Sequence, residues 1–149
     1  MNNKTREIMF ALLRSDICGT LLSDEEKSLY DAEILPQLKK IAKEHDVLQL
    51  LALGLQKNDL LEGNSSQLEN EIFKAAYRYE QLNYELNSLC ASLEKAQIRF
   101  LPLKGSVIRK YYPEPWMRTS CDIDVLVRAE DLDKAIEEYN RRNRRFGGV

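Results

Sequence analysis

The β-strand signal is clearest at Cys121-Asp122-Ile123-Asp124-Val125-Leu126-Val127, where apolar residues follow and separate two acidic ones. Side chains two apart on a strand share a face, so the carboxylates of Asp122 and Asp124 are expected to point to one side. Ile123, Val125 and Val127 take the other side, which predicts a buried face. Two adjacent carboxylates repel each other and favour a cation that prefers oxygen ligands, Mg²⁺ or Mn²⁺. A pair of solvated aspartates at a strand end explains the same pattern equally well.

A second feature lies upstream, where a short β-rich run at Ile98–Leu103 meets the turn Lys104-Gly105-Ser106. A short helix is predicted from Val107 to Tyr111. Glycine lets the backbone approach a ligand closely, and the free N–H groups at a helix start favour a phosphate. Lys104 adds positive charge. The motif alone is also compatible with an ordinary turn, because it is neither a Walker loop nor a dinucleotide fingerprint.

Arg118 precedes the acidic pair by four residues. Its planar guanidinium is suited either to hold a phosphate or to pair with the aspartates. Groups that bind phosphate, placed beside a carboxylate pair, indicate a site for a metal and a nucleoside triphosphate. Trp116 and Met117 are expected to pack within the preceding loop.

Three segments follow one another in a specific order: Phe100-Leu101-Pro102-Leu103-Lys104-Gly105-Ser106, Tyr111-Tyr112-Pro113-Glu114-Pro115, and Arg118-Thr119-Ser120-Cys121-Asp122-Ile123-Asp124-Val125-Leu126-Val127. This combination resembles the uncharacterised bacterial nucleotidyltransferase family of the DNA polymerase β-like nucleotidyltransferase superfamily. The family pattern is a Leu-Lys-Gly turn, a Tyr-Pro loop, an Arg, and Asp-Ile-Asp-Leu-Leu-Val on a strand. The resemblance covers about Ile98 to Tyr139, and the helical part before it carries no motif of the family.

The resemblance implies a metal-dependent transfer of a nucleoside monophosphate from a nucleoside triphosphate to an acceptor hydroxyl, with release of pyrophosphate. Asp122 and Asp124 would be the catalytic, metal-binding residues. Four residues would contact the nucleotide: Lys104, Gly105, Ser106 and Arg118. The acceptor stays open among a small molecule, a protein and an RNA end.

The region before Gln97 is expected to form successive helices. Apolar stripes predict helices around Ile8–Leu12, from the capping box Ser23–Glu26 to about Ile34, and from Pro36 onward. Asp46 is predicted to cap a helix over Val47–Gln56, and residues 63–66 break the pattern. The longest helix carries one stripe of eight apolar positions: Leu68, Ile72, Ala75, Tyr79, Leu82, Leu86, Leu89 and Leu93. Its tyrosines, Tyr77, Tyr79 and Tyr84, are interpreted as packing residues rather than as platforms for bases.

At the other end, Asp131 is predicted to cap a helix running to about Arg142. Four of its residues are expected to face inward: Leu132, Ala135, Ile136 and Tyr139. The superfamily adds a third carboxylate from a later strand, and no such strand follows here. We therefore expect a chain truncated at its C-terminus, with weak or no turnover by itself. The run Arg141-Arg142-Asn143-Arg144-Arg145 is interpreted as a solvated helix end, with RNA binding as the alternative.

The composition fits one α+β, predominantly helical fold. The chain has 149 residues, 44% of them hydrophobic, and a formal net charge of -2, which does not favour a nucleic-acid binder. The expected organisation is a helical bundle over residues 1–97 and a partial nucleotidyltransferase core, strand-helix-strand-helix, over residues 98–149, packed together as one compact unit. No apolar run reaches the length of a membrane helix. Three unpaired cysteines predict a reducing, cytoplasmic location.

A second class of function remains open. The dominant helical region and the early end of the chain are compatible with a non-catalytic interaction module or remnant. In that case a helical face left uncovered would bind another chain or drive self-association.

Overall fold

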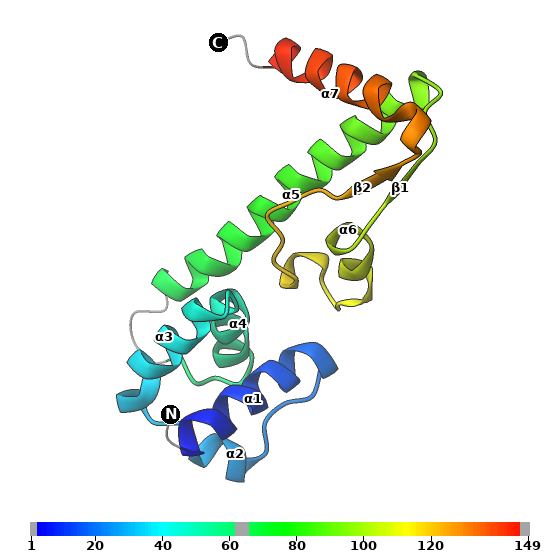
Figure 1. Ribbon diagram of the computed structural model, residues 1–149. Coiled ribbons are helices and arrows are strands. Elements are labelled where there is room, and N and C mark those ends of the chain that lie inside the picture. Colours follow the sequence, from blue (N-terminus) through cyan, green and yellow to red (C-terminus); the bar gives the residue numbers. More distant parts are fainter. Residues whose placement is uncertain (1–2, 62–65, 147–149) are drawn as a thin grey trace.

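One long helix, α5 (Ser66–Lys95), runs through the molecule and connects its two ends (Figure 1). The computed structural model describes residues 3–61 and 66–146. Four helices gather near the N-terminal end of α5: α1 (Asn3–Cys18), α2 (Asp24–Ser28), α3 (Leu35–Glu44) and α4 (Leu48–Lys57). The elements that follow α5 lie along it and at its far end: β1 (Phe100–Pro102), α6 (Gly105–Ile108), β2 (Val125–Val127) and α7 (Leu132–Phe146). Short 3-10 turns connect them: η1 (Ala32–Ile34), η2 (Arg109–Tyr111), η3 (Pro115–Met117) and η4 (Ala129–Asp131).

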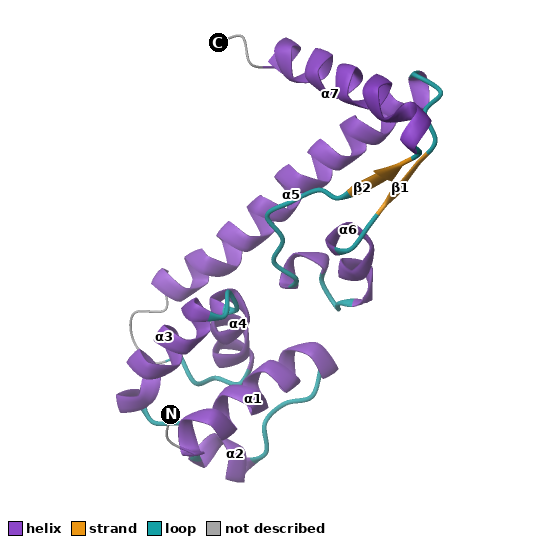
Figure 2. Cartoon of the chain, viewed as in Figure 1, coloured by secondary structure: helices purple, strands orange, loops and turns teal. Residues whose placement is uncertain are grey.

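The strands are short and most of the described chain is helical (Figure 2), so the predicted α+β, predominantly helical class is confirmed. Of the helix break predicted at residues 63–66, residues 63–65 lie outside the described residues, and Ser66 is the first residue of α5. None of the helices within residues 3–61 and 66–146 is long and apolar enough to cross a lipid bilayer.

The main hydrophobic core belongs to the helices near the N-terminus. The predicted apolar stripes are its source: the fully buried side chains include Ile8, Leu12, Leu38, Leu51 and Leu55. Leu68 joins this core from the first turns of α5. Burying a Leu or Ile contributes about 1.5–3 kcal/mol, so the stripes of α1, α3 and α4 stabilise this end.

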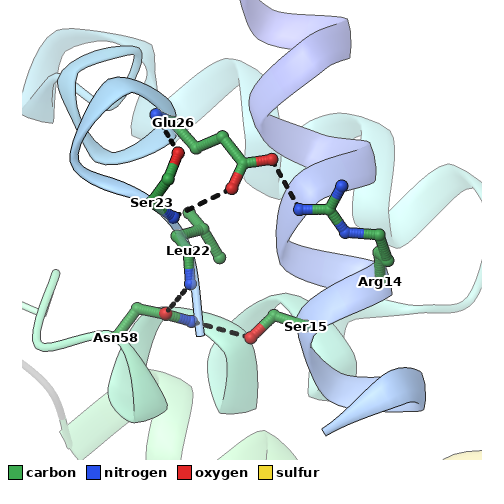
Figure 3. Close-up of polar contacts among 6 residues, drawn as sticks. All are labelled: Arg14, Ser15, Leu22, Ser23, Glu26 and Asn58. Atoms are coloured by element: carbon green, nitrogen blue, oxygen red, sulfur yellow. Dashed lines mark hydrogen bonds and ion pairs between the residues drawn. The ribbon is translucent and has the colours of Figure 1, made fainter. Parts of the chain in front are cut away.

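Polar contacts fix the chain between α1 and α4 (Figure 3). The capping box is confirmed: the Glu26 N–H donates to Ser23 Oγ (3.2 Å) and the Ser23 N–H donates to Glu26 Oε2 (2.9 Å). Arg14 of α1 pairs with the same carboxylate at 2.5 Å. Buried Asn58 accepts from the Leu22 N–H (2.8 Å) through its side-chain oxygen. Its amide also donates to Ser15 of α1 (3.1 Å), so one side chain ties the loop to two helices.

Two predicted helix boundaries were wrong. α2 ends at Ser28 rather than near Ile34, because Asp31 caps a separate 3-10 turn through the Glu33 N–H (2.9 Å). Asp46 caps no helix: it has φ +56°, the left-handed conformation common just after a helix, and terminates α3. α4 begins after Val47, without a side-chain cap.

β1 and β2 form an antiparallel pair in which Leu101 lies opposite Leu126. One further hydrogen bond, from the Leu103 N–H to the Asp124 carbonyl (2.9 Å), extends the ladder. The strand predicted over residues 121–127 therefore begins only at Val125. The chain turns away after Leu103, so the residues before Asp124 have no partner strand.

The outward face of this pair is apolar and uncovered. Leu101 is 57% exposed and Leu126 is 56% exposed. The inward residues Val125 and Val127 are only half-buried, so the predicted burial of that face is partial.

α7 packs on α5 through a polar stripe. Lys134 Nζ donates to the Ala96 carbonyl (2.6 Å), Ser92 Oγ donates to Glu138 Oε1 (2.6 Å), and Arg142 forms an ion pair with Glu85. Residues 134, 138 and 142 recur at steps of four and share one helix face.

The prediction that the apolar stripe of α7 faces inward was therefore wrong. Leu132, Ile136 and Tyr139 remain 48–49% exposed, because the polar stripe occupies the contact with α5. Two tyrosines of α5 also depart from the packing interpretation, since Tyr77 and Tyr84 are 57% and 62% exposed.

Candidate functional site

The Lys104-Gly105 turn joins β1 to α6 and has an unusual backbone. Lys104 has φ +44° and ψ −114°. Residues other than glycine adopt this backbone conformation rarely, at a cost of about 1–3 kcal/mol. Gly105 is buried, and a Cβ built on it would lie 2.7 Å from Ser120 Oγ. Any larger residue here would force Ser120 to move.

The acidic segment lies directly against this turn. Lys104 Nζ is 3.3 Å from Asp124 Oδ2. Ser120 Oγ lies 3.2 Å from the Asp122 carbonyl and 3.3 Å from Asp122 Oδ1, within hydrogen-bond distance of both. The structure thus brings together four predicted site residues, Lys104, Gly105, Asp122 and Asp124, around Ser120.

The other two predicted residues lie to either side. Ser106 is 9% exposed and borders a cavity of about 330 Å³ with a mixed polar and apolar lining, between α5 and the sheet, together with Ile123. Arg118 borders a different cleft, on the side of Ser120 that faces α4 and α5. Within the described residues, Arg118 makes no ion pair with Asp122 or Asp124. The structure therefore does not show the predicted alternative in which Arg118 pairs with the aspartates.

The donor set at Asp122 and Asp124 suits a divalent cation that brings its own further ligands. Mg²⁺ is commonly held by one or two carboxylates together with substrate phosphates and water. Among residues 3–61 and 66–146, no group of three or more His, Cys, Asp or Glu side chains gathers to hold a metal ion. The pair offers two carboxylates to a metal, and further ligands would have to come from phosphate or water.

Arg109 is a site residue that sequence reasoning missed. It is 7% exposed, its Nε donates to the Gly105 carbonyl (2.9 Å), and its guanidinium lies 5.3 Å from the centre of the Tyr79 ring. Burial lowers the pKa of Arg109, the hydroxyl-bearing ring of Tyr79 opposes that shift, and the nearby charge of Arg118 adds to it. The signal in the sequence was an arginine four residues after the glycine, one helical turn away.

Arg118 is the second cation near the turn. Its Nη1 donates to the adjacent Thr119 carbonyl (3.4 Å), and its Nε is buried without a hydrogen-bond partner in the described chain. Neither Arg109 nor Arg118 has a carboxylate partner among the described residues. Two neighbouring guanidinium groups without a counter-charge favour an anion.

The chain matches the model of a known protein family. A family model described as "Uncharacterised nucleotidyltransferase" matches residues 34–141, which include every predicted site residue. No curated protein and no solved structure matched the chain.

Proposed function

Because the chain belongs to the uncharacterised nucleotidyltransferase family, we propose that it binds a nucleoside triphosphate at the Lys104-Gly105 turn and transfers the nucleoside monophosphate to an acceptor hydroxyl. The observation that carries this proposal is the contact between the turn and the acidic segment, which are separated by about 20 residues and joined by the Leu103–Asp124 hydrogen bond. That contact would bring phosphate and carboxylates to the same place.

Each residue would have a distinct role. The backbone at Gly105 would approach the phosphates without a side chain in between, and Ser106 would contribute from the start of α6. Lys104 would neutralise phosphate charge, since its side chain is 70% exposed and free to turn from Asp124 toward a ligand. Arg118 would add positive charge from the opposite side of Ser120.

Asp122 and Asp124 would hold Mg²⁺ or Mn²⁺ together with the phosphates. When bound, the metal supplies positive charge that stabilises the phosphoryl oxygens. The acceptor oxygen would bond to the α-phosphorus while the bond from that phosphorus to the pyrophosphate oxygen breaks. The hydroxyl proton leaves to water or to a carboxylate of the pair.

A thermal-unfolding titration tests nucleotide binding. ATP, GTP, CTP and UTP are added separately with Mg²⁺. A ligand at ten times its Kd stabilises a protein by about 1.4 kcal/mol, which corresponds to a rise in Tm of about 3–6 °C for a chain of this size. Asp122→Asn with Asp124→Asn is expected to abolish that rise.

The matched control removes two aspartates at the other end of the molecule. Asp24→Asn with Asp31→Asn makes the same change in charge. Asp24 lies in the first turn of α2 and is not its cap, and asparagine caps the turn at Asp31 as well as aspartate does. This control should keep the full nucleotide response. No response to any nucleotide in the wild-type chain, or a response that survives in the Asp122/Asp124 variant, would rule out binding at this site.

A second function is favoured by the uncovered apolar surface, and it concerns interaction rather than catalysis. Five large side chains on β1, β2 and α7 are about half exposed or more: Leu101, Leu126, Leu132, Ile136 and Tyr139. Such residues commonly mark a protein–protein contact. Light scattering over a range of concentrations tests self-association through them, and a monomer at all concentrations that is unaffected by Leu126→Ser would count against it.

A further inference from the structure

A cleft of about 400 Å³ opens between α5, the start of α4 and the segment around and after η3. Five cationic side chains line it: Lys43, Lys74, Arg78, Arg109 and Arg118. We call it the basic cleft. Two carboxylates, Asp46 and Glu71, also border it, which leaves a net charge of +3 in a chain whose overall formal charge is -2.

The positive charge of the basic cleft is not neutralised within the described chain. Glu71 is engaged by Lys74 at 2.7 Å, so this pair contributes nothing to the balance. Arg78, Arg109 and Arg118 have no ion-pair partner among the described residues. Burying a charge without a counter-ion costs several kcal/mol, and Arg109 is 7% exposed with two uncharged partners, the Gly105 carbonyl and the Tyr79 ring. Placing an anion in the cleft would offset that cost.

The walls of the cleft are held by specific contacts. Gln49 of α4 donates from Nε2 to the Met117 carbonyl (3.3 Å), and Thr119 Oγ1 donates to the Asp46 carbonyl (3.3 Å). The cation–π contact orients the Arg109 guanidinium on Tyr79. The cleft is therefore built by contacts between segments far apart in the sequence rather than by one mobile loop.

The basic cleft adjoins the acidic pair without containing it. Ser120 borders the cleft and contacts Asp122, whereas Lys104, Asp122 and Asp124 do not line the cleft. A molecule in the cleft would thus lie beside a nucleotide bound at the turn, and Arg118, which lines the cleft, would serve both ligands. The volume is suited to one small ligand, because pockets for such ligands have volumes of about 300–1,000 Å³.

We propose that the basic cleft binds the phosphate group of a small phosphorylated molecule. Five cations gather at this one cavity rather than along an extended groove, which favours a small molecule over a polynucleotide. Identifying this molecule as the acceptor rests on the proposed function, while the phosphate binding itself does not.

Trp116, the chain's single tryptophan, lines the cleft and is a built-in fluorescent reporter. Ribose 5-phosphate, with ribose as the neutral control, is titrated in EDTA so that no divalent cation takes part. We expect the Trp116 fluorescence to change and then saturate with ribose 5-phosphate but not with ribose. The affinity for ribose 5-phosphate should fall as salt is added. No saturable change, or an equal response to ribose, would overturn the proposal.

Variants locate the binding. Arg78→Gln, on the exposed surface of α5, and Arg118→Gln should each weaken the affinity roughly tenfold or more. Arg128→Gln, an exposed arginine paired with Glu130 outside the cleft, should leave it unchanged. Because Arg78 is exposed, Arg78→Gln tests the cleft without disturbing the core. If Arg78→Gln and Arg118→Gln both left the affinity for ribose 5-phosphate unchanged, the proposal would be overturned.

Two arms separate this inference from the proposed function. Asp122→Asn with Asp124→Asn should lose nucleotide binding but retain ribose 5-phosphate binding; loss of both would place the phosphate at the acidic pair and overturn the inference. Complete displacement of ribose 5-phosphate by ATP would assign the cleft to the triphosphate, and displacement by a short RNA with much higher affinity would assign it to a polynucleotide. Either result overturns binding of a separate small ligand.

Discussion

Replacing Asp16 by asparagine is expected to stabilise the protein at neutral and alkaline pH but much less at acid pH. Asp16 is 1% exposed near the end of α1, and neither of its carboxylate oxygens has a hydrogen-bond partner within the described chain. Burial raises its pKa to about 7, and Lys57 of α4 opposes this only in part. The folded protein thus holds an aspartate that favours its neutral form.

The magnitude follows from the two pKa values. A rise from 3.8 to about 7, at ~1.4 kcal/mol per pH unit, corresponds to about 4 kcal/mol. The folded state binds the proton more tightly than the unfolded state, so the free energy of unfolding falls as the pH rises from 3.8 to about 7 and then levels off. Asparagine has the same shape and does not ionise, so the variant escapes that loss.

Urea unfolding at pH 5 and pH 8 measures the effect. The difference in unfolding free energy between Asp16→Asn and wild type should be larger at pH 8 than at pH 5 by about 2–3 kcal/mol. Asp59→Asn removes an exposed aspartate just after α4 and serves as the matched control. An equal effect of Asp16→Asn at both pH values would refute the reasoning.

Three further predictions concern backbone and charge, each measured by urea unfolding. Gly105→Ala should lower the free energy of unfolding by about 1–3 kcal/mol, because its Cβ would lie 2.7 Å from Ser120 Oγ. Adding Ser120→Gly should restore most of the lost stability, and no such recovery would contradict the clash. Lys104→Gly should gain about 1 kcal/mol by relieving φ +44°, so an unchanged midpoint would argue against strain. Glu85→Ala should cost about 1–3 kcal/mol, more than Arg142→Met, because only the first leaves a 9% exposed arginine without its counter-charge; the opposite order would contradict this.

The helices were predictable from sequence because their apolar stripes report directly on burial. Leu51 and Leu55 lie fully buried where the stripe of α4 placed them. Their ends were less predictable, since Asp46 is equally suited to begin a helix or to end one in the left-handed conformation. The sequence pattern around Asp46 does not distinguish the two.

Tertiary contacts account for the remaining differences. The stripe through Leu132 and Ile136 has the right period for burial, yet α7 docks through Lys134 and Arg142, whose partners on and after α5 no local pattern reveals. The strand before Val125 stops for a similar reason, because its pairing depends on where the other strand turns.

The candidate site shows the same division. The resemblance predicted the residues of the turn and the acidic segment, and the structure places Lys104 beside Asp124. Arg109 could not be assigned in this way, because its importance comes from lying over Tyr79 and beside Arg118. These contacts join residues that no short motif contains.

Ligand binding at the basic cleft, as proposed above, would affect how long the protein survives in a cell. An anion that binds only the folded chain lowers the population of opened molecules on which proteases act. A tenfold excess of ligand over Kd reduces that population about elevenfold. The abundance of the protein would then rise and fall with the supply of its own ligand, without any change in its synthesis.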